Sequence, residues 1–241
     1  MARILVLLPD TGSDPGEVAL PWQVWSEAGH AVCFATQSSG QAVCDPITLT
    51  GQGLPLQARS LRARASARTA YSALQADQAW QAPLRWDEVR ANDFDAFHFP
   101  GGHAPGMRPF CESPLIADLA RAAFAADLPV SAICHGTLPL ARAGVLKGRI
   151  TTSLTEPMER LSIMLTAGSL PGHYQTYPEP VEVEVRRSLG PGGSYLRGPL
   201  LPRFSGASNP DAGFVAEHGN YVSGRWPGDS WTLALRLAAR L

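Results

Sequence analysis

Short apolar runs that alternate with helical patterns limit the fold of this chain more than any other feature. The runs have the length and composition of buried strands: ARILVLLP (2–9), HAVCFAT (30–36), DAFHFP (95–100), PVSAIC (129–134) and GRITTSL (148–154). Apolar strands separated by helices form a parallel sheet that is covered on both faces. Because the crossovers are right-handed, we expect an α/β three-layer sandwich with a flavodoxin-like, mostly parallel sheet.

Helical patterns fill the intervals between these strands. The expected helices cover residues 15–28, 114–127, 135–144 and 156–168. A hairpin is predicted over residues 214–224, with its turn at His218–Asn220. The last stretch, 227–241, is an amphipathic helix with Pro227 near its start.

Three segments fit the alternation less well. Residues 37–54 are rich in Gly, Ser, Thr and Pro and predict a loop, and an Ala- and Arg-rich stretch from 55 to about 80 predicts a helix within an insertion near 55–90. Residues 169–213 stay ambiguous, because VEVEV alternates like a strand but its charges would also suit a surface helix. With no internal repeat and no linker, we expect a single domain over residues 1–241.

Composition excludes some classes of function. Apolar residues make up 45% of the chain and charged residues 17%, which argues against general disorder. The formal net charge of −1 gives no support to a nucleic-acid or anionic-membrane role. The first apolar run is too short for a signal-peptide core or a membrane span. We therefore expect a soluble, cytoplasmic protein that binds neither nucleic acid nor membrane.

The four cysteines do not form a metal or redox motif. They are Cys33, Cys44, Cys111 and Cys134, and no two have C-x-x-C spacing, so a structural zinc site or a redox dithiol is not expected. Disulfides are not expected either without an export signal. The glycine spacing around LKGR does not match a phosphate loop. The sequence therefore predicts neither a metal nor a cofactor.

Cys134 occupies the most informative position, at the end of the strand in VSAICHGTL (130–138). Ligands bind beyond the carboxyl ends of strands in doubly wound sheets, and a sharp strand-to-helix turn projects one side chain upward as a nucleophile elbow. Ala132 and Gly136 supply the small neighbours that such a turn needs. The following helix N-terminus and His135, when charged, would both favour the thiolate. The alternative is a buried core cysteine.

FPGGH (99–103) ends the preceding strand and predicts oxyanion and substrate contacts. Gly101 and Gly102 would let backbone N–H groups approach a substrate oxygen without a side chain in the way. His103 follows them and is expected to face the substrate, although a loop histidine bonded to backbone is the alternative. His98 alternates away from Phe97 and Phe99 and is expected to face the opposite layer.

Glu17 has two interpretations. Asp14 and Pro15 predict a helix start with Asp14 as N-cap, which would place Glu17 at the capping-box position and make it structural. In a desolvated site, the same carboxyl would instead hold a proton, because burial raises a carboxyl pKa.

These residues together resemble the ThiJ/PfpI superfamily, which has the class I glutamine amidotransferase-like fold. The resemblance covers nearly the whole chain and depends on the first strand and helix with Glu17, DAFHFPGGHAPGM, AICHG with LARAGVLKGRITTS, and LTEPME. The long insertion and His103 are most similar to the heat-shock chaperone and glyoxalase III branch.

The resemblance implies roles for individual residues. Cys134 would be the nucleophile and His135 its partner, with Glu17 as the acidic residue beside the thiol. Alignment of LTEPME makes Glu159 the carboxylate that orients His135, with Glu156 as its rival. The oxyanion donors would be the backbone N–H groups of Gly102 and His135.

The implied function is cofactor-independent turnover of small reactive carbonyls, such as conversion of methylglyoxal to lactate. The alternatives are a PfpI-type cysteine peptidase or amidohydrolase, and a stress-response holdase or redox sensor without turnover. The resemblance leaves open a homodimer or a higher oligomer. Ala104, Pro105 and Thr137 depart from the glyoxalase branch, so substrate specificity is less fixed than the nucleophile.

Overall fold

A seven-stranded sheet forms the centre of the computed structural model, which describes residues 1–241. The strand order is β3-β2-β1-β4-β5-β9-β8, and every neighbouring pair is parallel except β8 and β9. The strands are β1 (Arg3–Leu7), β2 (Ala31–Thr36), β3 (Leu84–Arg85), β4 (Ala96–Phe99), β5 (Val130–Ile133), β8 (Val215–His218) and β9 (Tyr221–Gly224). This confirms the predicted flavodoxin-like sheet and the hairpin of the last two strands.

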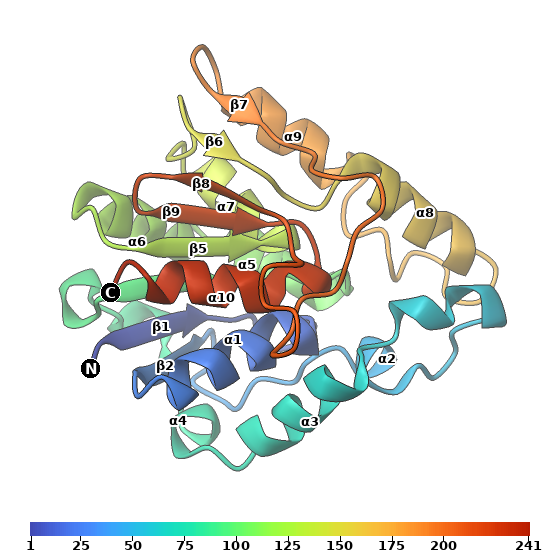
Figure 1. Cartoon of the computed structure of the whole chain (residues 1–241), viewed down its shortest axis with the longest axis horizontal. Coiled ribbons are helices and arrows are strands. Elements are labelled where there is room, and N and C mark those ends of the chain that lie inside the picture. The colour runs from blue at the N-terminus through green and yellow to red at the C-terminus, as the bar shows by residue number, and fades with distance from the viewer.

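Helices cover both faces of the sheet, so the molecule has three layers (Figure 1). One face is covered by α1 (Pro15–Glu27), α3 (Ala65–Leu74), α4 (Gln78–Gln81) and α10 (Ser230–Ala238), which share a cluster of 20 buried hydrophobic residues with the sheet. The other face is covered by α5 (Arg108–Glu112), α6 (Pro114–Ala125), α7 (Thr137–Arg142) and α9 (Val181–Ser188). None of the helices is long and apolar enough to cross a bilayer.

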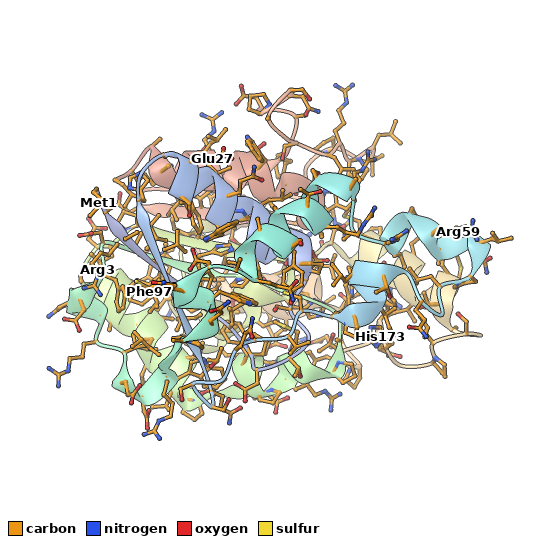
Figure 2. All side chains as sticks on the ribbon, turned by 90° about the horizontal axis from the view of Figure 1, so that it is seen from below. Met1, Arg3, Glu27, Arg59, Phe97 and His173 are labelled. Carbon is orange, nitrogen blue, oxygen red and sulfur yellow. The ribbon has the colours of Figure 1, made fainter.

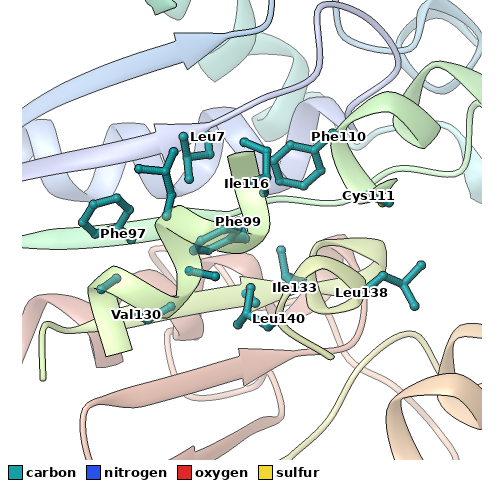
Figure 3. Packing of buried hydrophobic residues seen from close by; sticks show 14 of the residues in the cluster. Leu7, Phe97, Phe99, Phe110, Cys111, Ile116, Val130, Ile133, Leu138 and Leu140 are labelled. Carbon is teal, nitrogen blue, oxygen red and sulfur yellow. The ribbon is translucent and has the colours of Figure 1, made fainter. Parts of the chain in front are cut away.

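The larger core lies on the face of α6 and α7, where 30 buried hydrophobic residues pack together. Figure 3 shows part of this cluster, with Phe97 and Phe99 of β4 near Val130 of β5. His98 points to the opposite layer, as its alternation predicts. There its ring packs edge-on against Trp25, and Nε2 lies 2.9 Å from the Glu17 carbonyl oxygen. This contact holds the start of α1 against the sheet.

Two segments, one predicted as a loop and one as a single helix, are each composed of several shorter elements in the structure. The loop expected over 37–54 contains the short helix α2 (Pro46–Thr50), because Asp45 caps its N–H groups and Gly51 ends it with φ +77°. The helix expected from 55 to about 80 is split into η1 (Leu56–Leu61), α3 and α4. The chain is extended at Arg62 and Arg64, where the Ala63 N–H is bonded to the α2 carbonyl of Thr48.

GRITTSL is the largest departure from the predicted sheet. Only β6 (Ile150–Thr151) is a strand, and it pairs with β7 (Ser194–Tyr195) in a separate two-stranded sheet. β8 already occupies the free edge of β9, so this segment contacts β9 through side chains, with the Thr152 N–H donating to Ser223 Oγ at 2.9 Å. The ambiguous VEVEV stretch is helical and forms α9.

The remaining elements are α8 and short 3₁₀ turns. α8 (Glu156–Thr166) begins close to its predicted start and packs against η1. The turns are η2 (Trp86–Glu88), η3 (Ala91–Asp93), η4 (Pro105–Met107), η5 (Cys134–Gly136) and η6 (Pro227–Asp229). The short strand β3 at the sheet edge had no counterpart in the sequence interpretation.

Candidate active site

The carboxyl ends of three neighbouring strands bring the predicted site residues together. Glu17 follows β1 at the start of α1, Gly101 follows β4, and Cys134 follows β5. The chain leaves β1 toward β2 and leaves β4 toward β5, so the strand order reverses between β1 and β4. Ligands of open α/β sheets bind at such a reversal.

Cys134 lies at a sharp turn between β5 and α7. Its φ is +57°, a left-handed conformation that is uncommon for a residue with a side chain. The turn depends on a glycine two residues later, because a Cβ on Gly136 would lie 2.0 Å from the Phe99 carbonyl oxygen. The geometry of a nucleophile elbow, expected from the small neighbours of Cys134, is therefore present.

Glu17 is completely buried beside this turn. Its Oε2 accepts a hydrogen bond from the Gly101 N–H at 2.8 Å, and its Oε1 has no partner within the chain. The side chain does not complete a capping box, because the Asp14 N–H donates to the Gly101 carbonyl. Burial, followed by the nearby Asp14 charge, raises the pKa of Glu17 well above 4.5. Burial therefore favours the protonated form of the Glu17 carboxyl.

Cys134 and His135 are also buried, which changes the expected protonation of the pair. The Sγ atom lies 3.5 Å from His135 Nδ1. Burial, together with Glu17, raises the pKa of the thiol well above 9.0, although the His135 backbone N–H partly opposes this. Burial also lowers the pKa of His135 well below 6.5. The closed site thus holds a neutral thiol beside a neutral imidazole, rather than the thiolate that the helix N-terminus was expected to favour.

Glu159 is the carboxylate that the structure places near His135. Its Oε1 is 3.9 Å from His135 Nε2, and its Oε2 accepts from the Val181 N–H at 2.9 Å. Burial raises its pKa to about 7. Glu156 lies elsewhere on α8 and pairs with Arg160 at 2.8 Å. Of the two rivals, Glu159 is the one beside the imidazole, at a distance longer than a hydrogen bond.

The glycines after β4 differ in what their N–H groups can do. The Gly101 N–H is already bonded to Glu17, whereas the Gly102 N–H has no partner within the chain. Gly102 has φ +156°, and a Cβ there would lie 2.3 Å from the Gly12 carbonyl oxygen. Gly101 therefore positions Glu17, and Gly102 is the residue with a free donor.

The connection between α8 and α9, residues 167–180, contributes a second wall that we call the roof segment. The Tyr174 ring packs against His103 with ring centroids 5.2 Å apart, and His103 packs against His135 at 5.1 Å. Thr176 Oγ1 donates to the His103 carbonyl oxygen at 2.5 Å. The roof segment thus reaches the site through contacts with His103.

A hydrogen bond attaches the roof segment to the first half of the chain. His173 Nε2 lies 3.0 Å from Asp45 Oδ2, at the N-cap of α2. The same carboxylate accepts from Thr48 Oγ1 at 2.6 Å. Hydrogen bonding and charge attraction from His173 contribute to a lowered pKa of Asp45, against the effect of burial.

Four buried polar atoms around the site lack a hydrogen-bond partner. They are Glu17 Oε1, His135 Nε2, His103 Nδ1 and the Tyr174 hydroxyl. Buried polar groups are nearly always bonded, so a cluster of unpartnered ones indicates where the oxygen atoms of a ligand would bind. No group of three or more His, Cys, Asp or Glu side chains is arranged to hold a metal ion.

From the sequence, Tyr174 and Tyr177 were expected at most to rim a pocket, and the pairing of His173 with Asp45 was not assigned. Tyr174 and Tyr177 fall in a polar loop, and nothing in their spacing distinguishes them. In the structure Tyr174 faces His103, while Tyr177 bonds to Glu112 at 3.0 Å. The signal available was the pair of adjacent aromatic rings, His173 and Tyr174, in an otherwise polar stretch.

Comparison with known proteins places the chain among relatives of similar architecture. An uncharacterized protein of Schizosaccharomyces pombe is 25% identical over 241 residues, which is 94% of this chain and 79% of the relative. A deglycase from Pyrococcus abyssi is 30% identical over 151 residues, 63% of this chain and 71% of the relative. The crystal structure of glyoxalase III from Candida albicans superposes with a TM-score of 0.70 at 16% identity, covering 100% of this chain and 97% of that one.

The family assignment depends on a match along most of the chain. The family model described as ThiJ/PfpI family-like matches residues 8–199, which begin directly after β1 and include the glycines after β4, the Cys134 turn and the roof segment. Together with the sheet order and the relatives above, this match shows that the chain belongs to the ThiJ/PfpI family.

Proposed function

We propose that this protein is a cofactor-independent enzyme that uses Cys134 to convert small reactive carbonyls, with methylglyoxal to lactate as the reaction. The observation that carries the proposal is the completely buried carboxyl of Glu17, whose Oε1 has no partner, beside a thiol and an imidazole. This chemistry requires a nucleophile, an acid and a base within reach of one substrate.

The first step is addition of the thiol to the aldehyde. The Cys134 sulfur bonds to the aldehyde carbon, and its proton passes through His135 Nδ1, 3.5 Å away, to the former carbonyl oxygen. The product is a hemithioacetal. The free N–H of Gly102 and the backbone N–H of His135 stabilise the negative charge that develops on that oxygen.

The second step moves two protons through an enediol. Neutral His135 removes the hydrogen on the first carbon, while Glu17 donates its proton to the ketone oxygen. The proton on His135 then goes to the second carbon, and the hydroxyl proton of the first carbon returns to Glu17, which gives a lactoyl thioester. Glu159 near Nε2 orients the imidazole and stabilises its charged form. Water finally hydrolyses the thioester, releasing lactate and restoring the thiol.

The burial of the site favours a small substrate over a peptide. Cys134 is 1% exposed and His135 is 0% exposed. Tyr174 packs on His103, which packs on His135, and the two present unpartnered polar atoms that suit the second oxygen of a dicarbonyl. An extended peptide would have to displace the whole roof segment, so the peptidase alternative receives less support.

Lactate formation without glutathione tests the proposal. We expect the wild type to produce lactate from methylglyoxal and Cys134→Ala to produce none above the uncatalysed rate. Cys33→Ala is the control, because Cys33 lies on β2, away from the Cys134 turn. Absence of lactate from the wild type, or lactate formation by Cys134→Ala, would contradict the proposal.

Removal of a sugar-type adduct from proteins is the second candidate, because the Pyrococcus abyssi relative is a deglycase. The two activities differ in the species that enters the site. The test uses a preformed adduct of methylglyoxal with N-acetylcysteine. If free aldehyde is the substrate, the rate at which this adduct disappears cannot exceed the rate of its spontaneous dissociation. Disappearance above that limit, dependent on Cys134, would establish deglycation instead.

A further inference from the structure

A second feature lies outside this site, in the segment between Asp45 and Asp77. Residues 46–76 contain four arginines and no acidic residue. The whole chain has a formal net charge of −1, so the rest of the molecule is acidic and this segment is an isolated region of positive charge. Such regions attract anions.

The four arginines converge on one surface hollow. Arg59, Arg62, Arg64 and Arg68 line a hollow with a volume of about 530 Å³ between η1 and the start of α3. None of them pairs with a carboxylate, whereas Arg142 binds Glu184 through two nitrogens. Figure 2 shows Arg59 at the end of the molecule that also carries His173.

Neutral donors line the same hollow. The hydroxyl groups of Ser60 and Ser66 belong to its wall. α3, ten residues long, starts there with no side-chain cap and no acidic residue in its first turn, so its first N–H groups are not bonded by a cap. Arg64 lies over the Phe204 ring, 3.8 Å from the centroid, which fixes one guanidinium at the rim.

We propose that this hollow binds a small polyanion that carries phosphate groups, such as a triphosphate. Guanidinium groups match phosphate oxygens in a bidentate geometry, and four unpaired ones require more than one negative charge. The volume falls in the range of small-molecule sites, whereas a nucleic acid would need a longer track of positive charge. None of the lining residues belongs to the candidate active site, so the proposal goes beyond the reaction at Cys134.

Calorimetric titration with sodium tripolyphosphate at fixed ionic strength tests the proposal. We expect the wild type to bind, and the double variant Arg59→Gln/Arg62→Gln to bind at least tenfold more weakly. The matched control is Arg121→Gln/Arg187→Gln, which removes the same net charge from exposed arginines elsewhere, paired with Asp118 and Glu179. All substituted side chains are exposed, so the fold should be retained and can be verified by circular dichroism.

Three outcomes would overturn the proposal. The first is absence of heat or saturation at millimolar tripolyphosphate. The second is equal weakening in both double variants, which would indicate an effect of net charge alone. The third is tighter binding of a single-stranded oligonucleotide than of tripolyphosphate through the same arginines, which would assign the hollow to nucleic acid.

Discussion

At the scale of single residues, the buried proton on Glu17 has the largest expected effect on rate. Glu17→Gln keeps an acceptor for the Gly101 N–H but removes the transferable proton. We expect kcat/KM for methylglyoxal to fall by about 10²–10⁴, the usual contribution of a general acid or base. Glu156→Gln is the control, because Glu156 pairs with Arg160 and should not affect activity. Retention of more than about a tenth of the activity by Glu17→Gln would assign proton transfer to another group.

The raised pKa of Glu159 predicts how activity and stability depend on pH. Its pKa is raised to about 7 by burial, so the orienting carboxylate forms only as pH rises through this value, and activity should increase over the same range. Stability changes in the opposite direction. The folded protein binds more protons than the unfolded chain between pH 4.5 and about 7, so this group lowers the free energy of unfolding as pH rises.

Glu159→Gln is the variant that separates these effects. We expect it to lose the rise in activity near pH 7 and to lose the corresponding fall in stability, which amounts to a few kcal/mol at most at about 1.4 kcal/mol per unit of pKa. Rate profiles and urea unfolding at pH 5 and pH 8 measure the two. An unchanged rate profile in Glu159→Gln would exclude it as the orienting group.

At the scale of elements, the turn between β5 and α7 depends on Gly136. A Cβ there would lie 2.0 Å from the Phe99 carbonyl oxygen, which belongs to a strand and cannot move aside. We expect Gly136→Ala to abolish activity and to destabilise the protein by about 3 kcal/mol or more, measured by urea unfolding. Gly168→Ala is the control, because nothing lies within 4 Å of its Cβ position. A stable, active Gly136→Ala would show that the turn can be rebuilt.

The roof segment should open when its hydrogen bond to Asp45 is removed. His173→Phe keeps a ring beside Tyr174 but loses the bond to Asp45. A hydrogen bond to a charged group contributes about 1.5–3 kcal/mol, so amide hydrogen exchange within residues 170–178 should accelerate by about tenfold or more. His30→Phe, which removes a histidine outside the site, should leave this exchange unchanged. Unchanged exchange in His173→Phe would show that other contacts hold the segment.

The sequence predicts most elements because their signals are local. Asp14 with Pro15 starts α1, and the alternation around His98 gives the two faces of β4, as the structure confirms. GRITTSL was expected to be a strand over residues 148–154, but only Ile150–Thr151 is one. β8 occupies the edge of β9, so this segment pairs with β7 instead. A local sequence pattern cannot show which of two segments takes a given sheet edge.

At the scale of the whole molecule, the predicted site residues follow strands of the sheet, whereas the roof residues lie in an irregular connection between helices. Cys134, Gly101 and Glu17 each follow a strand of one parallel sheet, so the fold class alone places them at the same edge. Tyr174 reaches His103 from an irregular connection after α8, and its position depends on how that connection folds back. Sequence periodicity cannot specify such a path, so the sequence predicts at most that Tyr174 and Tyr177 rim a pocket and does not give their contacts.

The burial of the cysteines makes the thiols internal reporters of how the molecule opens. Cys33 is partly exposed, whereas Cys44, Cys111 and Cys134 are buried. A coloured thiol reagent should therefore modify one group quickly in the native protein and the other three only as their surroundings open. Since Cys44 precedes α2, Cys111 lies in α5 and Cys134 begins the turn after β5, the order of their modification would rank the local opening of these three regions.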